Sequence, residues 1–436
     1  MLKRSGPATI GATPQRSAWL RTAVPPARFS PLDRDLRTNV AVIGGGYAGL
    51  NAALRLREMG KDVVVLETET IGFGASGRNG GQVIPGLKYD PPELIAMFGA
   101  QRGGALIEFA GNAPERTFDF IEKHQLDCDA ARSGWFQPAT DVRTMARARA
   151  RALSWADRDV RVQIYDSDQT RQATGSDFYI GGWTDPRGGY LQPLSYAREL
   201  ARIAVRDGAS IFERSAATAT RQTGDGWTVS VNGHTVTAGQ VLVCTNGYTG
   251  DLVPGLRRSI IPASSIVCAT APLPDELRRS IMPSGLPISD ARRLLIYARF
   301  DAQGRFLIGA RGSFGLHEPE SYFQRLRSSA AKIFPQLEDA KWEDSWGGNF
   351  ALTLDHLPHI HNPAAGLYAV AGCNGRGVAM LSQIGRLIAD LAAGNIAQTE
   401  SPIPITPIAP IPFHPLRRPG LELATLWYRT SDKLGI

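Results

Sequence analysis

Three glycines near the start of the sequence have the spacing of a phosphate-binding turn. Gly44, Gly46 and Gly49 follow an apolar stretch at 39–43, which we expect to be a strand, and precede a helical stretch at 50–59. Glycines so placed allow a tight bend, let the backbone approach a pyrophosphate and pack the helix closely on the strand. The helix N-terminus adds free N–H groups and partial positive charge. These residues predict a dinucleotide-binding site.

An acidic residue and a second loop extend this pattern. Glu67 ends a second apolar strand at 62–66, where a carboxylate can accept hydrogen bonds from ribose hydroxyls. A polar, glycine-rich loop at 72–82 follows, and a backbone nearly free of side chains suits an extended cofactor such as FAD. An ordinary glycine-rich loop is the alternative interpretation. FAD and NAD both use the first turn, but the second loop disfavours an NAD-dependent dehydrogenase.

The end of the folded chain repeats the opening arrangement. We expect a strand at 367–370, then a glycine-rich loop, then a helix at 378–393.

The order of these segments resembles that of a known enzyme family. The run 74–82, with the turn before it, is similar to the FAD-dependent amine and amino-acid oxidoreductases that include D-amino-acid oxidase, glycine oxidase and sarcosine oxidase. Three further segments match in order, at 189–201, 241–248 and 366–394. Together they extend the resemblance over residues 37–394, and the motif order is less specific for substrate than for the family.

The resemblance implies cofactor contacts position by position. The ADP half of FAD would be held by Gly44, Gly46, Gly49 and Glu67, and adenine would touch Ala217. Along the pyrophosphate and flavin would lie Ala75, Ser76, Arg78, Asn79, Gly80 and Gly81. A second nucleotide-binding layer would be closed by Thr245, Asn246 and Gly247. At the isoalloxazine ring, on a helix N-terminus, would lie Gly372, Asn374, Gly375, Arg376, Gly377 and Val378.

The mode of flavin attachment follows from a departure from the family. Covalent members tether the flavin through Cys or His, but here the region 346–349 has no Cys and the loop 76–82 has no His. We therefore expect noncovalent FAD. Cys373, beside the C-terminal flavin segment, is the one remaining candidate for a covalent bond.

A second departure concerns the substrate. Members that bind a plain alpha-amino acid hold its carboxylate with an Arg, whose planar fork matches that group, and Phe350 occupies that place here. This argues against a simple alpha-amino acid, although Arg299 or Arg311 could bind a carboxylate from another direction. By position alone, Tyr190, Arg299 and Phe350 are predicted substrate contacts, and no catalytic residue is predicted.

The resemblance implies oxidation of a C–N bond in a small amine or amino-acid derivative, such as gamma-glutamylputrescine. A hydride would pass to flavin N5, and the resulting imine would hydrolyse. Oxygen or another acceptor would reoxidise the flavin. Two alternatives stay open: a D-amino-acid or secondary-amine dehydrogenase of the same fold that passes electrons to a quinone, and a non-enzymatic FAD-binding sensor.

We predict an α/β fold, with a Rossmann-like FAD-binding domain of glutathione-reductase type and an inserted antiparallel-sheet substrate domain. Turn signals such as Asn232-Gly233 and the hairpin at 301–304 support the inserted sheet. The predicted boundaries are an N-terminal extension at 1–36, a discontinuous FAD-binding domain at 37–90, 185–255 and 345–395, a substrate domain at 91–184 and 256–344, and a Pro-rich C-terminal tail at 396–436.

The net positive charge of the chain bears on possible nucleic-acid partners and on the role of the N-terminus. A formal net charge of +7 permits a nucleic-acid partner, but the one dense basic run, at 143–151, lies in an Ala-rich helical stretch that we interpret as a solvated helix face. An anionic cofactor uses positive potential equally well. The basic N-terminus has the bias of a mitochondrial transit peptide, yet its prolines break the helix that such a signal needs. We therefore predict a loose extension and no nucleic-acid partner.

The remaining motifs indicate no disulfide, metal site or membrane span. The four cysteines, Cys128, Cys244, Cys268 and Cys373, lack disulfide or metal spacing, and no run reaches the roughly 18 apolar residues of a membrane span. The cluster from Asp355 to His361 contains two histidines on one side of a strand, but we predict no metal there. We expect a soluble, cytoplasmic protein of undetermined oligomeric state.

Overall fold

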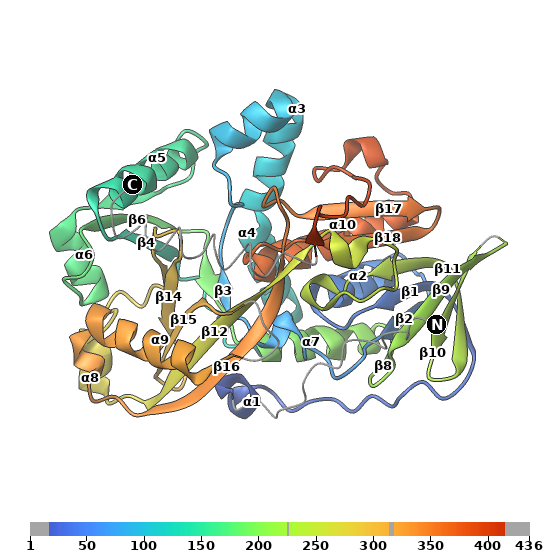
Figure 1. The fold of residues 1–436 in the computed structure, drawn as a ribbon, viewed down its shortest axis with the longest axis horizontal. Coiled ribbons are helices and arrows are strands. Elements are labelled where there is room, and N and C mark those ends of the chain that lie inside the picture. Colours follow the sequence, from blue (N-terminus) through green and yellow to red (C-terminus); the bar gives the residue numbers. More distant parts are fainter. Residues whose placement is uncertain (1–16, 225, 314–317, 415–436) are drawn as a thin grey trace.

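Two large sheets, each covered by helices, form the body of the molecule (Figure 1). The computed structural model describes residues 17–224, 226–313 and 318–414. The two sheets lie next to each other, and the segments that build them alternate along the sequence. The predicted α/β fold is therefore confirmed.

The first sheet has a parallel centre. Its main path, in spatial order, is β17 (His359–Ala364), β18 (Leu367–Ala371), β11 (His234–Val243), β1 (Leu36–Ile43), β2 (Val63–Leu66) and β8 (Ser210–Phe212). All neighbours on this path are parallel except β17 and β18. β9 (Ala217–Thr223) and β10 (Gly226–Val231) extend β11 as an antiparallel ribbon. Buried runs such as Val63–Leu66 are typical of parallel strands covered on both faces.

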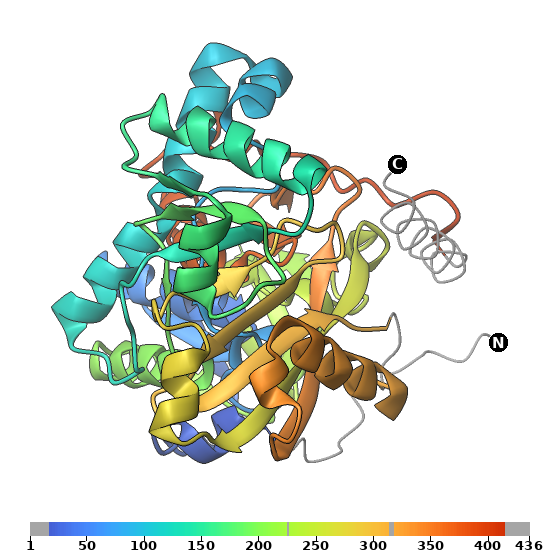
Figure 2. The same cartoon turned by 90° about the vertical axis from the view of Figure 1, so that its left-hand side faces the viewer.

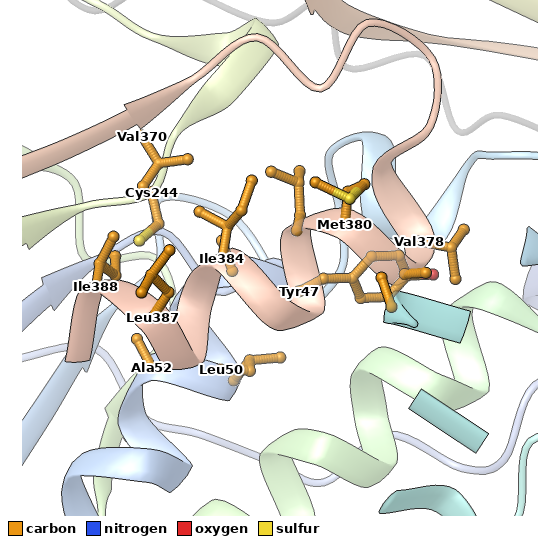
Figure 3. Close-up of a cluster of buried hydrophobic side chains, with 14 of the residues drawn as sticks. Tyr47, Leu50, Ala52, Cys244, Val370, Val378, Met380, Ile384, Leu387 and Ile388 are labelled. Carbon is orange, nitrogen blue, oxygen red and sulfur yellow. The ribbon is translucent and has the colours of Figure 1, made fainter. Parts of the chain in front are cut away.

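Helices α2 (Tyr47–Glu58), α7 (Pro193–Arg206) and α10 (Gly377–Ala393) pack together beside this sheet. Leu50, Ile384 and Leu387 meet in the shared core (Figure 3). A Cβ at Gly385 would lie 2.2 Å from the Ala48 carbonyl oxygen, so glycine is what allows α10 to approach α2 this closely. The predicted strand–helix–strand unit and the predicted C-terminal strand and helix are both present.

The second sheet is largely antiparallel. Its strands, in spatial order, are β16 (Trp342–Leu352), β12 (Ile261–Pro272), β15 (Arg305–Arg311), β14 (Ile296–Phe300), β13 (Ile288–Ser289), β4 (Trp135–Ala139), β6 (Gly181–Asp185) and β5 (Gln163–Tyr165). Only β13 and β4 pair in parallel. β16 crosses the domain boundary that we predicted at residue 345, because it continues to pair with β12 as far as Leu352.

Around this second sheet, on the side that faces the viewer in Figure 2, lie α5 (Val142–Ala156), α6 (Ser167–Thr174), α8 (Asp275–Ser280) and α9 (Glu320–Ile333). Two further helices are α3 (Pro91–Gly111) and α4 (Ala113–His124), and α4 packs against α10. α9 packs against β12 and β15, and a short ribbon of β3 (Gln82–Val83) and β7 (Gly189–Tyr190) forms a third, two-stranded sheet. Among the described helices, none is both long and apolar enough to cross a membrane.

The prediction of a loose N-terminal extension is wrong for residues 17–35. The short helix α1 (Ala18–Thr22) buries Trp19 completely, and Leu32 is 2% exposed. The Leu32 N–H donates to Ser215 Oγ at 2.9 Å. The prolines do prevent a long helix, but they do not prevent single apolar side chains from being buried between elements. Residues 1–16 lie outside the described part of the chain.

The first part of the C-terminal tail runs along the first sheet. The Thr406 N–H donates to the Ile360 carbonyl oxygen at 2.9 Å, and Ile403 is buried. The predicted tail residues 415–436 lie outside the described residues.

Candidate active site

The first glycine-rich turn is closely packed. Gly44 has φ +111°, which a residue with a side chain rarely adopts, and a Cβ at Gly49 would lie 2.0 Å from the Gly44 carbonyl oxygen. The Gly45 N–H donates to Glu67 Oε2 at 2.7 Å. The turn and the carboxylate at the end of β2 are therefore held together.

Glu67 lies in a polar setting at the edge of the sheet. Burial raises the pKa of Glu67, while N–H groups of Glu69 and Gly45 oppose the shift by bonding to the ionised carboxylate. The Ser215 N–H donates to the Glu67 carbonyl oxygen at 2.8 Å. Ala217 follows two residues later at the start of β9, so the predicted adenine contact lies close to the predicted ribose ligand.

The second glycine-rich loop is tied to the helix that follows the first. The Tyr47 N–H donates to Ser76 Oγ at 3.0 Å, and the Tyr47 hydroxyl donates to the Ser76 carbonyl oxygen at 2.6 Å. Ala75 begins the turn that leads to Asn79, whose N–H donates to the Ala75 carbonyl oxygen. The Gly81 N–H in turn donates to Asn79 Oδ1 at 2.8 Å. The loop is thus internally bonded.

Two residues of this loop face the second sheet. Arg78 NH1 donates to the Gly347 carbonyl oxygen on β16 at 3.4 Å, while its Nε donates to the Phe73 carbonyl oxygen within the loop at 2.6 Å. A Cβ at Gly80 would lie 2.4 Å from the Tyr297 ring. The loop therefore lies between the two sheets, where a cofactor would meet the substrate domain.

The C-terminal segment and the turn after β11 meet at Asn246. Its Nδ2 donates to Cys373 Sγ at 3.2 Å, and its Oδ1 accepts the Gly372 N–H at 3.3 Å. Thr245 Oγ1 bonds to Thr249 Oγ1 at 2.6 Å, and Gly247 lies against the backbone of Phe350. The structure thus brings the two predicted segments together.

Positive φ angles shape the C-terminal segment itself. Gly372, Asn374 and Gly375 have φ of +85°, +49° and +81°. Asn374 Oδ1 accepts the Thr353 N–H at 3.1 Å. Arg376 NH1 donates to the Pro85 carbonyl oxygen at 2.6 Å, and Gly377 and Val378 then open α10. Burial, followed by the charge of Arg151, lowers the pKa of Arg376 to about 9, which leaves it charged at neutral pH.

The helices α2 and α10 begin without the usual polar cap. Neither has a capping side chain or an acidic residue in its first turn, whereas every other α-helix in the described ranges has at least one of these. Free N–H groups and the partial positive charge of a helix start favour an anionic ligand. With the glycine turn and Glu67, these two helix starts fit the phosphates and the flavin ring of FAD.

The three predicted substrate contacts differ in their surroundings. Arg299 is 3% exposed, and its nitrogens donate to the carbonyl oxygens of Gly80, Phe300 and Leu191, so its contacts are to the loop backbone. Tyr190 stands beside it, with the Arg299 guanidinium 5.0 Å from its ring. Phe350 lies 3.8 Å from the position of a Cβ on Gly375, next to the predicted flavin segment.

Several functional candidates escaped the sequence analysis. Tyr47 followed the glycine turn as an apparent core residue, although a buried Tyr needs a partner for its hydroxyl. Trp19 and Trp346 bond to the second loop from distant parts of the chain. Lys88 lies among cations: partial burial, then the charges of Arg376 and Arg151, lower its pKa. No local signal marked Trp19, Trp346 or Lys88.

The histidine pair has a different role from metal binding. His359 bonds to Asp355 Oδ1 and to Thr406 Oγ1, each at 3.0 Å, and His361 bonds to the Thr406 carbonyl oxygen at 2.8 Å. Within the described ranges no group of three or more potential ligands could hold a metal ion. The pair docks the C-terminal tail on β17.

Comparison with known proteins decides the family. The sequence pattern of the FAD-dependent oxidoreductase family known as DAO matches residues 39–391. The chain belongs to this family. The gamma-glutamylputrescine oxidoreductase of Escherichia coli (strain K12) is 32% identical over 418 residues, which cover 94% of this chain and 96% of that protein. The probable oxidoreductase OrdL of Haemophilus influenzae is 32% identical over 379 residues, covering 84% and 86%.

Solved structures of the DAO family share this fold. Glycine oxidase from Geobacillus kaustophilus superposes with a TM-score of 0.72 at 23% sequence identity, covering 85% of this chain and 99% of that one. Iminodiacetate oxidase from Chelativorans sp. BNC1 gives 0.71 at 17% identity, covering 85% and 100%. The chain is therefore a FAD-dependent amine or amino-acid oxidoreductase that acts on CH–NH or CH–NH2 groups.

Proposed function

We propose that the protein binds FAD noncovalently and oxidises the C–N bond of a small amine that also carries a carboxylate, of the gamma-glutamylputrescine type. The observation that carries this proposal is a group of cations next to the C-terminal flavin segment. Relatives at 32% identity over most of the chain include a gamma-glutamylputrescine oxidoreductase, which supports the same substrate class.

Lys88 and His356 lie on two loops that are tied to the flavin segment, and Arg311 ends β15. Arg376 bonds to Pro85, at the start of the loop that contains Lys88. On the other side, the loop with His356 is fixed because Thr353 Oγ1 donates to the Leu357 carbonyl oxygen and the Thr353 N–H donates to Asn374. Burial, then the charge of Lys88, lowers the pKa of His356, and Arg311 also contributes. The positive potential from Lys88, Arg376 and Arg311 favours an anionic group on the substrate.

Lys88 is the best candidate to contact that group. The residue is partly exposed to solvent, and it forms no ion pair with a carboxylate in the described part of the chain. Burial lowers its pKa, and the charges of its neighbours Arg376, Arg151 and Arg311 lower it further, as expected for a cation that lacks a compensating anion. A substrate carboxylate would supply the missing partner.

The protein's own contribution to the reaction is positioning. When bound, FAD supplies the hydride acceptor, and the imine product is then hydrolysed by water. The uncapped start of α10 and the Arg376 cation are placed to stabilise negative charge on the ring system. Phe350 and Tyr190 are the proposed apolar contacts that orient the amine, and no side chain needs to act as an acid or base if the amine binds in its neutral form.

Noncovalent attachment is consistent with the state of Cys373. The thiol is 8% exposed, burial raises its pKa, and its sulfur accepts a hydrogen bond from Asn246. A thiol held in the protonated form is a weak nucleophile. Denaturing the holoprotein is therefore expected to release all of its FAD into solution.

The test is an anaerobic titration of the holoprotein, followed by the visible absorption of oxidised flavin. Gamma-glutamylputrescine and putrescine form a matched pair, since only the first carries a carboxylate. We expect the first to reduce the flavin at much lower concentration, and Lys88→Gln to raise its KM about tenfold, as for one lost charged hydrogen bond. Lys61→Gln, at an exposed lysine in the α2–β2 connection, is the control.

Each outcome has a distinct meaning. Equal reduction by putrescine would contradict the carboxylate requirement. A yellow protein that neither these amines nor sarcosine nor D-alanine reduces would contradict the substrate class. Reoxidation of the reduced protein in air would identify oxygen as an acceptor, whereas its absence would favour another acceptor such as a quinone.

A further inference from the structure

Four consecutive carbonyl oxygens in the second glycine-rich loop each accept a hydrogen bond from a different part of the chain. The carbonyl groups belong to Arg78, Asn79, Gly80 and Gly81, and their donors are, in order, Trp346 Nε1 at 2.9 Å, Trp19 Nε1 at 2.9 Å, Arg299 Nε at 2.7 Å and the Leu191 N–H at 2.8 Å. The second of these donors comes from α1, which precedes the residues matched by the family pattern.

These bonds fix the orientation of the peptide groups. A trans peptide places its C=O and N–H on opposite sides, so the bond from Trp19 to the Asn79 carbonyl turns the Gly80 N–H away from α1. The other N–H groups of this stretch are occupied: that of Asn79 bonds to Ala75, and that of Gly81 bonds to Asn79 Oδ1. The Gly80 N–H donates to no acceptor in the part of the chain that the structure describes.

Gly80 is half-buried, and an N–H group shielded from water destabilises the structure unless a ligand accepts its hydrogen bond. The loop lies at the predicted cofactor site, and the acceptors that a flavin ring offers at its edge are carbonyl oxygens and ring nitrogens. The Gly80 N–H is therefore available to the cofactor, and Trp19 determines its direction.

Trp19 is itself held firmly. Its side chain is fully buried, it meets the Trp346 ring edge-on at 5.7 Å, and the Arg299 guanidinium lies 4.8 Å from its centre. Its carbonyl oxygen accepts Gln192 Nε2 at 3.0 Å. Shortly after α1, the Val24 N–H donates to Ser195 Oγ at 3.0 Å.

An ion pair adds a second attachment. Arg21 pairs with Asp344 on β16, the strand that also contains Trp346. The segment 17–24 is thus bonded to the second sheet, to α7 and to the flavin loop at once.

We propose that Trp19 is a positioning residue for FAD, and that the segment 17–24 is a clamp that aims the Gly80 N–H at the flavin ring. This inference rests on FAD binding and not on the identity of the amine, so it stands or falls separately from the proposed substrate.

The test compares two substitutions and two truncations of the full-length holoprotein. Trp19→Phe keeps an aromatic ring but removes the donor, and Leu20→Ala alters the exposed neighbour as a control. Removal of residues 1–23 deletes the clamp, whereas removal of residues 1–16 leaves it in place. For each variant we would measure the dissociation constant for FAD, the flavin reduction potential, the visible spectrum and the thermal unfolding of the apoprotein.

We expect Trp19→Phe to weaken FAD binding about fivefold, the equivalent of one hydrogen bond of about 1 kcal/mol, and to shift both the reduction potential and the flavin spectrum. Removal of residues 1–23 should weaken binding more than tenfold, while Leu20→Ala and removal of residues 1–16 should change neither quantity. Variants that lose thermal stability but bind FAD with the original affinity, potential and spectrum would overturn the proposal and leave Trp19 a purely structural residue.

Discussion

Two helices of the substrate domain begin differently from the two helices at the cofactor site. In the substrate domain, the Thr144 N–H at the start of α5 donates to Asp141 Oδ1 and the Gln169 N–H at the start of α6 donates to Asp166 Oδ1, each at 2.8 Å. In the cofactor domain, α2 and α10 begin at Gly46 and Arg376 with no capping side chain. In the first pair a side chain accepts a hydrogen bond from the helix N-terminus, whereas in the second pair this place is left for a ligand.

The difference has an energetic meaning. A missing N-cap typically costs about 1 kcal/mol of stability, so α2 and α10 are less stable alone than their sequences would permit. A bound anionic cofactor that accepts hydrogen bonds from the free N–H groups offsets this cost. The helix starts are therefore ready to bind an anionic cofactor, and the stability of the apoprotein is lower as a result.

The largest effect is expected from adding a cap where none exists. In Gly46→Asp, the new carboxylate would bond the first N–H groups of α2 and repel the pyrophosphate, with only Ser76 Oγ within 3 Å of the new Cβ. We expect FAD affinity to fall more than about 100-fold, since both the hydrogen bonds and the favourable charge are lost, while the apoprotein unfolds at an equal or higher temperature. Gly46→Asn is the control for charge, because an Asn side chain can cap the first N–H groups of α2 but carries no charge that would repel the pyrophosphate. Undiminished FAD binding in Gly46→Asp would refute the assignment of this helix start.

The second effect concerns the start of α10. Arg376→Gln removes the cation closest to the helix start, and we expect flavin reduction by a saturating amine to slow about tenfold, as for lost stabilisation of a developing negative charge. Stopped-flow absorbance under anaerobic conditions measures this rate. Arg386→Gln is the control, because Arg386 lies on the same helix but pairs with Glu58 at 2.7 Å. Equal rates in both variants would show that Arg376 only supports the loop at Pro85.

A third experiment uses pH to test whether the charge of Lys88 binds the substrate carboxylate. The pKa of Lys88 is lowered by burial and by nearby cations, so its charge is lost at lower pH than that of an ordinary lysine as pH rises. We expect the preference for gamma-glutamylputrescine over putrescine, measured as a ratio of kcat/KM, to fall about fivefold as this charge is lost, as for a lost surface-exposed charge pair. Because the amines of the two substrates differ in their own pKa, the profile is compared with that of Lys88→Gln, in which the substrates titrate but residue 88 does not. A profile in Lys88→Gln that is identical to the wild type would refute the role of Lys88.

The smallest effect should come from removing a cap in the substrate domain. Asp141→Ala is expected to lower the free energy of unfolding by about 1 kcal/mol and to leave the FAD dissociation constant unchanged, as chemical denaturation and a binding titration would show. Partial burial acts to raise the pKa of Asp141, but hydrogen bonds from Thr144 and Thr140 outweigh it and lower that pKa. The stabilisation is thus present at neutral pH and lost as pH falls through that lowered pKa. A parallel loss of FAD would show that the two kinds of helix are coupled.

The sequence predicted those parts of the site whose physical cause is local. The glycine turn, Glu67 and the start of α10 depend on residues close together in the chain, and each was located from spacing and residue type. The predicted contacts at Asn246 and Gly372 also came together, because parallel strands such as β11 and β18 end at the same edge of their sheet.

The parts that escaped prediction depend on residues far apart in the chain. Trp19, Trp346 and Arg299 act on consecutive peptide groups of one loop, yet nothing in their own neighbourhoods marks them as loop ligands. The expectation for residues 17–35 was wrong because helix-breaking prolines describe only local backbone preference. Burial of Trp19 is a tertiary effect that overrides this preference.

The strand order of the first sheet constrains when the protein can acquire its cofactor during synthesis. β18 and α10 come from residues 367–393, yet they pair with β11 and pack on α2, which the ribosome makes far earlier. A nascent or prematurely terminated chain can therefore form the first glycine turn without being able to enclose a flavin. Only a chain that has been translated through α10 can retain FAD. An incomplete chain binds no flavin, stays unfolded in this region and is a substrate for chaperones and proteases.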